Sequence, residues 1–110
     1  MATFKSVGNR IDYTPTSADV AAGAVVVQNT LVGVATEPIA QNALGALDID
    51  GVFAVAKATG TGTGIQAGKV VYWKSDPGQA TESSTGNTRM GVTVLAAADA
   101  DATVLVKLNV

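Results

Sequence analysis

An internal repeat is the feature that most constrains what this chain can fold into. Residues 20–27 (VAAGAVVV) and residues 65–72 (IQAGKVVY) share the pattern apolar-x-Ala-Gly-x-Val-Val, where x is any residue. Further along each copy, residues 90–92 (MGV) repeat residues 32–34 (VGV). Two copies are too few for a solenoid, so the repeat predicts a duplicated β-module that closes on itself.

Short β-branched runs separated by Gly and Asn turns indicate strands throughout the chain. We expect strands at residues 11–13, 25–27, 31–34, 47–49, 52–56, 69–73, 79–81, 89–95 and 103–108. Residues 36–45 fit two structures, because Pro38 and Gly45 suit the ends of a two-turn helix while an ordered loop fits as well. We favour the loop. The predicted fold class is all-β: a small antiparallel β-barrel or β-clip-like domain with at most one or two short helical turns.

The predicted organisation is one β-domain preceded by an arm. Residues 1–17 form the N-terminal arm and the first short strands, and residues 18–110 form the single β-domain. Within this domain the two modules cover about residues 18–57 and 64–108, and the small-residue linker 58–63 joins them.

Composition excludes several classes of active site. The chain has no Cys and no His, which removes disulfides, thiolate nucleophiles, the commonest zinc ligands and every His-based catalytic triad. Seven cations and nine carboxylates give a net charge of −2, so no basic groove for nucleic acid is expected. No apolar run is long enough to span a membrane, and the N-terminus lacks a signal pattern. We expect a soluble protein that is not an enzyme and carries no cofactor.

The glycine-rich residues 60–64 (GTGTG) resemble a nucleotide-binding loop but fail at defined positions. A dinucleotide fingerprint requires a third glycine where this chain has Ile65. A phosphate-binding loop requires Ser or Thr after Gly68-Lys69, where this chain has Val70. We interpret the segment as a flexible linker.

Two pairs of aspartates are the other candidates for chemistry. Asp48 with Asp50, and Asp99 with Asp101, each place two carboxylates on one face of a strand or loop. Calcium binding or acid–base catalysis would need such convergence, but more ligands or partners than a pair. Charges that discourage edge-to-edge aggregation explain them better. We therefore predict no catalytic residue and no metal site.

The candidate partner-binding residues are aromatic or basic. Tyr72 and Trp73 are the bulkiest point of the chain, and on a strand one of them must face away from the core. They are interpreted either as a core residue beside a partly exposed tyrosine or as anchors of an interface. Phe4, Lys5 and Arg10 lie in the N-terminal arm, which is either a frayed end or a strand donated to a neighbour's sheet edge.

Many short segments, in order along the chain, resemble those of the small capsid cement, or head decoration, proteins of tailed bacteriophages. They are residues 1–4, 8–15, 18–23, 32–35, 45–47, 51–53, 57–58, 68–73, 86–88, 91, 101–104 and 106–108. No single segment is diagnostic, but their order and spacing together are specific. The duplicated module also resembles the β-clip fold of the lambda-type decoration proteins.

The resemblance implies a decoration protein that binds the outer surface of the expanded phage head and stabilises it. It implies contacts with the major capsid protein and with other copies of the chain, as a homotrimer on local three-fold axes or as a dimer. It implies synthesis in the bacterial host cytoplasm and no nucleic-acid or membrane partner. Members of this family are often labelled RecA/RadA-like recombinases, and the missing phosphate-binding loop argues against that label. The alternative is a non-enzymatic β-domain that binds glycan or peptide on a virion or cell surface.

Overall fold

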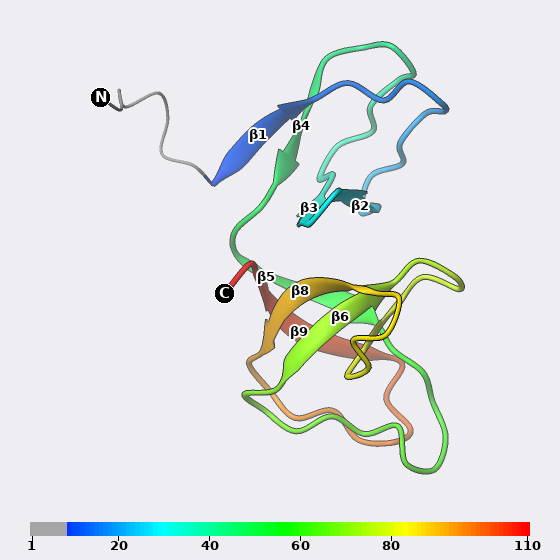
Figure 1. Cartoon of the computed structure of the whole chain (residues 1–110), viewed down its shortest axis with the longest axis vertical. Helices are drawn as coiled ribbons and strands as arrows, with labels where there is room; N and C mark the ends of the chain where they lie inside the picture. Colours follow the sequence, from blue (N-terminus) through cyan, green and yellow to red (C-terminus); the bar gives the residue numbers. More distant parts are fainter. Residues whose placement is uncertain (1–8) are drawn as a thin grey trace.

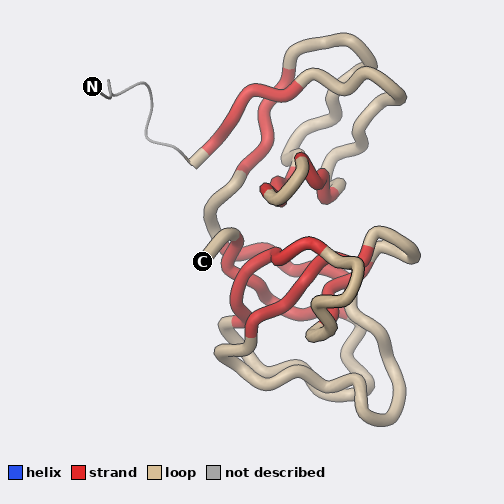
Figure 2. Tube along the Cα trace, in the orientation of Figure 1, coloured by secondary structure: helices blue, strands red, loops and turns tan. Residues whose placement is uncertain are grey.

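The computed structural model describes residues 9–110 and contains two antiparallel sheets arranged along its long axis (Figure 1). The strands of this part of the chain are β1 (Arg10–Tyr13), β2 (Val25–Gln28), β3 (Leu31–Val34), β4 (Gly45–Asp48), β5 (Val52–Ala56), β6 (Val70–Lys74), β7 (Gln79–Thr81), β8 (Thr88–Thr93) and β9 (Thr103–Leu108). Loops and turns join them, and no helix lies in residues 9–110 (Figure 2). The predicted all-β class is confirmed, and residues 36–44 form the loop that we favoured.

The first sheet contains β1 to β4 in the order β1-β4-β3-β2. β1 pairs along its whole length with β4, from Arg10 opposite Asp48 to Tyr13 opposite Gly45. β2 and β3 form a hairpin, and a single position, Val34 opposite Asp48, joins β3 to β4. The sheet therefore consists of two strand pairs with a short contact between them.

The second sheet contains β5 to β9 in the order β5-β9-β8-β6-β7. Its edge strands β5 and β7 approach each other at one parallel bridge, between Lys57 and Ala80. The sheet therefore curls strongly, but no closed barrel is found in the described residues, and the predicted barrel or clip geometry is not confirmed.

The two sheets have the same strand order, which is the structural form of the sequence repeat. β1-β4-β3-β2 of the first sheet corresponds to β5-β9-β8-β6 of the second, and β7 is an addition to the second copy. The isolated bridges also correspond: Val20 with Ile39 in the first copy, and Ile65 with Ala97 in the second. In both repeats the Ala-Gly turn is closed by a backbone hydrogen bond, from Gly23 to Ala35 (2.6 Å) and from Gly68 to Thr93 (2.8 Å).

The sheets divide the chain between Asp48 and Val52, which lies before the predicted linker 58–63. β5 falls in the predicted first module but pairs with β9 in the second sheet. β1, which we had placed with the N-terminal arm, is a full strand of the first sheet. These two strands occupy the same position in their sheets although they share little sequence beyond apolar residues at alternate positions.

Two clusters of buried side chains hold the fold together. The larger cluster lies within the second sheet and against β3; its buried members are Val32, Val34, Val55, Ile65, Val71, Ala80, Met90, Ala97, Val104, Val106 and Leu108. The smaller cluster lies inside the first sheet and consists of Ala35, Ile39 and Leu47 with half-buried neighbours. Because Val32 and Val34 come from the first sheet, the larger cluster joins the two copies of the repeat.

The repeated glycines Gly33 and Gly91 occupy corresponding places in β3 and β8 where a facing strand leaves no room for a side chain. A Cβ at Gly33 would lie 2.9 Å from the Cβ of Leu47, and a Cβ at Gly91 would overlap the carbonyl of Lys107. Close backbone approach therefore explains why glycine recurs at the centre of the repeated motif.

Candidate interaction surfaces

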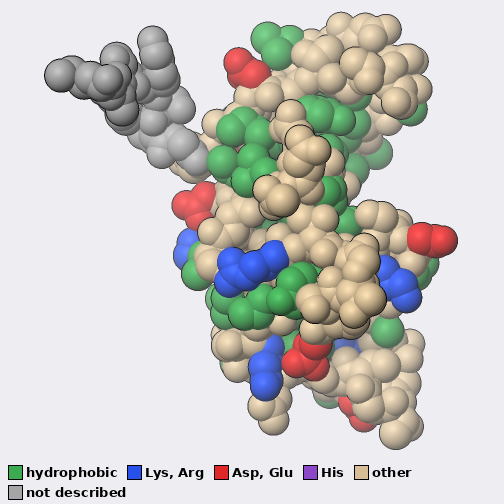
Figure 3. Space-filling model, viewed as in Figure 1, with side chains coloured by type: hydrophobic (Ala, Val, Ile, Leu, Met, Phe, Trp, Pro, Cys, Tyr) green, Lys and Arg blue, Asp and Glu red, His purple; other side chains and the backbone are tan. Residues whose placement is uncertain are grey.

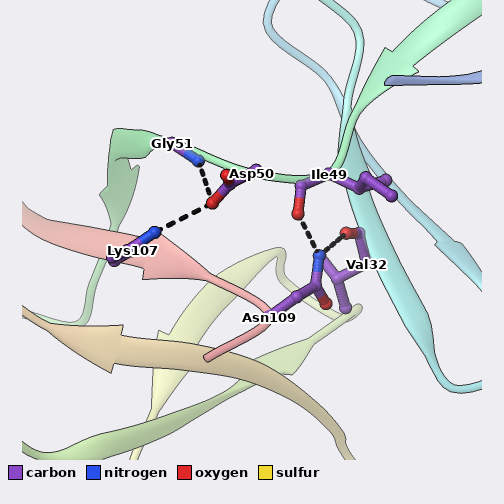
Figure 4. Close-up of polar contacts among 6 residues, drawn as sticks. All are labelled: Val32, Ile49, Asp50, Gly51, Lys107 and Asn109. Atoms are coloured by element: carbon purple, nitrogen blue, oxygen red, sulfur yellow. Dashed lines mark hydrogen bonds and ion pairs between the residues drawn. The ribbon is translucent and has the colours of Figure 1, made fainter. Parts of the chain in front are cut away.

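The junction between the sheets is held by Asn109, which follows β9. Asn109 adopts a left-handed backbone conformation, with φ of 56°, and its amide nitrogen donates to the carbonyls of Val32 (3.0 Å) and Ile49 (2.6 Å). Figure 4 shows this side chain between the end of β9, strand β3 and the connection from β4 to β5. One side chain thus joins the end of the second copy to the first.

An ion pair lies beside this junction. The Lys107 ammonium is 2.8 Å from the Asp50 carboxylate, which also accepts a hydrogen bond from the Gly51 N–H (Figure 4). The hydrogen bond from Lys107, followed by that from Gly51 and the charge of the ammonium, lowers the pKa of Asp50 below its ordinary value. Asp50 is therefore a partner of Lys107 rather than half of a metal site with Asp48, which pairs with Arg10.

Tyr72 and Trp73 lie on opposite faces of β6, as strand alternation requires. Trp73 packs half-buried against the larger cluster. Tyr72 lies opposite Arg89 of β8 and Thr81 of β7, on the outer face of the sheet. Both remain predicted partner-binding residues, and the structure places only Tyr72 on a face directed away from the core.

Arg10, the third predicted contact residue in the described part, lies at the start of β1. Its guanidinium pairs with Asp48 and donates to the Thr36 hydroxyl at 3.2 Å. It lines a hollow of about 430 Å³ beside the 36–44 loop, together with the carboxylates of Asp12 and Glu37. We call this feature the acidic hollow. Phe4 and Lys5 lie outside the described residues.

The outer face of the second sheet is the surface that sequence reasoning missed. Strand pairing sets Val70, Val92, Lys107 and Val52 side by side across β6, β8, β9 and β5. The next row continues the same face with Val94, Leu105 and Ala54. Cross-strand neighbours share one face, so we call these residues, with Tyr72 and Arg89, the open face. The signal in the sequence was the lack of polar alternation in β5 and β6.

The Gly60–Gly64 segment is closed by Asp99 and forms no phosphate cradle. The Asp99 carboxylate accepts the Gly64 N–H at 2.7 Å, and hydrogen bonds from Gly64, then Gly62, lower its pKa below the ordinary value. Asp101 accepts the N–H of Ala98 at 2.9 Å. Both carboxylates therefore fix loops.

Lys57 is a buried cation beside this segment. Its side chain lines a second hollow, of about 240 Å³, and its ammonium donates to the carbonyls of Ala58 (2.7 Å) and Asp101 (2.8 Å). Neither Tyr72 nor Trp73 lines either hollow. Within residues 9–110 no three acidic residues converge as a metal site would need, and no helix is long and apolar enough to cross a membrane.

Comparison with protein-family models gives the deciding observation, because the model described as phage cement protein matches residues 5–108. The chain belongs to this family. The resemblance seen in the sequence is thereby confirmed, and it covers both sheets. Phage cement proteins are structural rather than catalytic, and membership places the protein on the phage capsid. Comparisons with curated proteins and with solved structures found no match.

Proposed function

We propose that this cement protein binds the outer surface of the expanded phage head and stabilises it. It contacts the major capsid protein and other copies of itself, as a homotrimer, after synthesis in the host cytoplasm. The observation that carries the proposal is the family match over nearly the whole chain. A protein that binds only the expanded lattice stabilises that lattice by mass action, and repetition over the shell multiplies a modest contact.

The fold suits this role because it offers extended surfaces rather than an enclosed site. The apolar row of the open face lies on the second sheet, and the acidic hollow lies beside the first sheet. Both surfaces are accessible to a partner. The ion pairs Lys107–Asp50 and Arg10–Asp48 neutralise charges beside these surfaces, which lowers the cost of removing them from water.

Co-sedimentation with heads of the phage tests the proposal. We expect saturable binding to expanded heads and none to unexpanded proheads, with a stoichiometry that distinguishes trimers from dimers. Failure to bind expanded heads would refute the cement role proposed here.

The N-terminal arm is the proposed contact with the capsid or a neighbour. Deleting residues 2–6, which include Phe4 and Lys5, is expected to abolish head binding while the thermal unfolding midpoint changes little. Arg10 remains in this variant and keeps its ion pair with Asp48. Head binding that equals that of the full chain would remove the arm from the interface.

The glycan- or peptide-binding alternative required a groove lined by Tyr72 and Trp73. These side chains lie on opposite faces of β6, so they do not share one groove. No other observation favours that alternative, and the cement role stands as the single proposed function.

A further inference from the structure

The open face of the second sheet is largely apolar apart from Arg89 and Lys107, where a solvent-facing sheet is normally polar. Three of its valines are well exposed: Val52 by 51%, Val94 by 39% and Val70 by 38%. Antiparallel sheets with one free face usually alternate apolar residues toward the core with polar residues toward water. Here both faces of β5 and β6 are largely apolar.

The size of this face is that of a functional patch. Four strands about 4.8 Å apart and five residues of about 3.4 Å each cover roughly 300 Å². Apolar patches of this size on small proteins are often binding sites. An area of this order is below the roughly 800 Å² that each partner buries in a standard interface, so other contacts must add to it.

The first copy of the repeat shows what covers an equivalent face. Val25 and Val34 occupy the positions in β2 and β3 that Val70 and Val92 occupy in β6 and β8. Val34 is 4% exposed and belongs to the larger cluster, against which Val25 also packs. The corresponding surface of the first sheet is thus buried against the second sheet of the same chain. The open face of the second sheet has no such cover within residues 9–110.

The distribution of charge indicates which surface could cover the open face. Residues 9–50 carry one Arg and five carboxylates, a net charge of −4, whereas residues 51–110 carry five cations and four carboxylates, a net charge of +1. The strands of the second sheet contain three cations and no carboxylate. On the side shown in Figure 3, the Lys and Arg side chains lie in the lower half, whereas Asp and Glu side chains lie in both halves.

The acidic hollow of the first sheet complements this face in charge and in apolar character. It presents the carboxylates of Asp12 and Glu37 beside Arg10, whose charge is paired with Asp48, and Leu44 at the hollow is 73% exposed. On the open face Arg89 has no carboxylate partner within the described residues, because the only ion pairs there involve Arg10 and Lys107. Arg89 and the exposed valines of the open face are therefore complementary to the carboxylates of Asp12 and Glu37 and to the exposed Leu44 of the hollow.

We propose that the open face of one copy binds the acidic hollow of a second copy, so that copies of this chain associate head to tail. The contact joins two different surfaces, and such contacts close into rings when the rotation between copies permits. The proposed function includes a contact between copies of this chain, and the present inference names the surfaces of that contact. It rests on the proposed function only for the existence of this self-contact. The occupant is a second copy because the chain itself supplies both complementary surfaces.

Charge reversal tests the contact in free solution, without phage heads. Sedimentation velocity is measured over a wide concentration range for the full chain, for Arg89→Glu, for Glu37→Arg and for the double variant. Glu82→Arg is the matched control for Glu37→Arg, because it makes the same charge change at a residue that lines the second hollow and belongs to neither proposed surface. Circular dichroism and thermal unfolding establish that each variant is folded.

Each single reversal is expected to raise the dissociation constant at least about tenfold, since it creates like-charge contacts. The double variant is expected to recover most of the association, and the control to match the unchanged chain. A chain that stays monomeric at every concentration, or single variants that match the control, would overturn the proposal. Loss in both single variants without recovery in the double variant would also overturn the pairing of these two surfaces. If Arg89→Glu does not fold, the comparison of Glu37→Arg with the Glu82→Arg control still tests the proposal, because Glu37 lies in a loop of the first sheet.

Head binding is measured separately on the same proteins. Folded variants that stop self-association yet still sediment with expanded heads leave the capsid role standing. Self-association without any head binding would refute the capsid role and leave the head-to-tail contact standing. The two ideas therefore fail in distinguishable ways.

Discussion

Replacing Asn109 with Asp should weaken the junction between the two sheets, although it changes only an amide nitrogen to an oxygen. Asp has nearly the same size as Asn and tolerates the same left-handed conformation, here at φ of 56°. It loses both donations, to Val32 and to Ile49, and sets a carboxylate against two carbonyl oxygens.

The expected magnitude follows from the two lost hydrogen bonds. Each contributes about 0.5–1.5 kcal/mol, so Asn109→Asp should lower the free energy of unfolding by about 1–3 kcal/mol. Average unfolding entropies per residue convert this to a fall in Tm of about 4–13 °C for a chain of this length. The backbone hydrogen bond from Asn109 to Met90 is retained, so the end of β9 keeps its place.

The assay is thermal unfolding followed by the fluorescence of Trp73, the single tryptophan, which packs against the larger cluster. Asn29→Asp is the matched control, because Asn29 has φ of 57° in the β2–β3 turn and the charge change is identical. Equal midpoints for Asn109→Asp and Asn29→Asp would refute the role assigned to the junction.

Substitutions at three further positions test the interior and the loops. Lys57→Ala removes two hydrogen bonds and a buried stem and should cost about 2–4 kcal/mol, whereas Lys57→Met should cost less; equal urea midpoints would contradict this. Gly91→Ala should prevent or severely impair folding because its Cβ overlaps the Lys107 carbonyl, as circular dichroism would show. The lowered pKa of Asp99 means that its carboxylate stabilises the fold above the ordinary value of 3.8, and this contribution is lost as pH falls through the lower folded value. As the pH falls from about 5 into the acid range, Asp99→Asn should therefore lose less free energy of unfolding than the unchanged chain. Equal losses in the two proteins would argue against the loop contact between Asp99 and Gly64.

The repeat made the strands and the common turns predictable from the sequence. The Ala-Gly turns are constrained by local backbone geometry, with positive φ at Gly23 and Gly68. The central glycines Gly33 and Gly91 are constrained by the close approach of a facing strand, and both constraints leave a repeated glycine in the sequence. The alternation of Tyr72 and Trp73 across β6 was predictable for the same reason.

What the sequence did not reveal depends on contacts between distant segments. Asn109 contacts a carbonyl 77 residues earlier, and no local pattern marks that partnership. The assignment of β5 to the second sheet depends on its pairing with β9, because β-branched runs do not encode which neighbour they join. The burial of Lys57 and the acidic hollow likewise arise only after folding.

The central claim is that this protein stabilises the expanded phage head. The most direct measurement is the temperature at which purified expanded heads rupture, with and without saturating protein. The account predicts a higher rupture temperature for expanded heads with the protein and no change for unexpanded proheads, because binding only the expanded state stabilises that state. An unchanged rupture temperature at saturating occupancy would contradict the account.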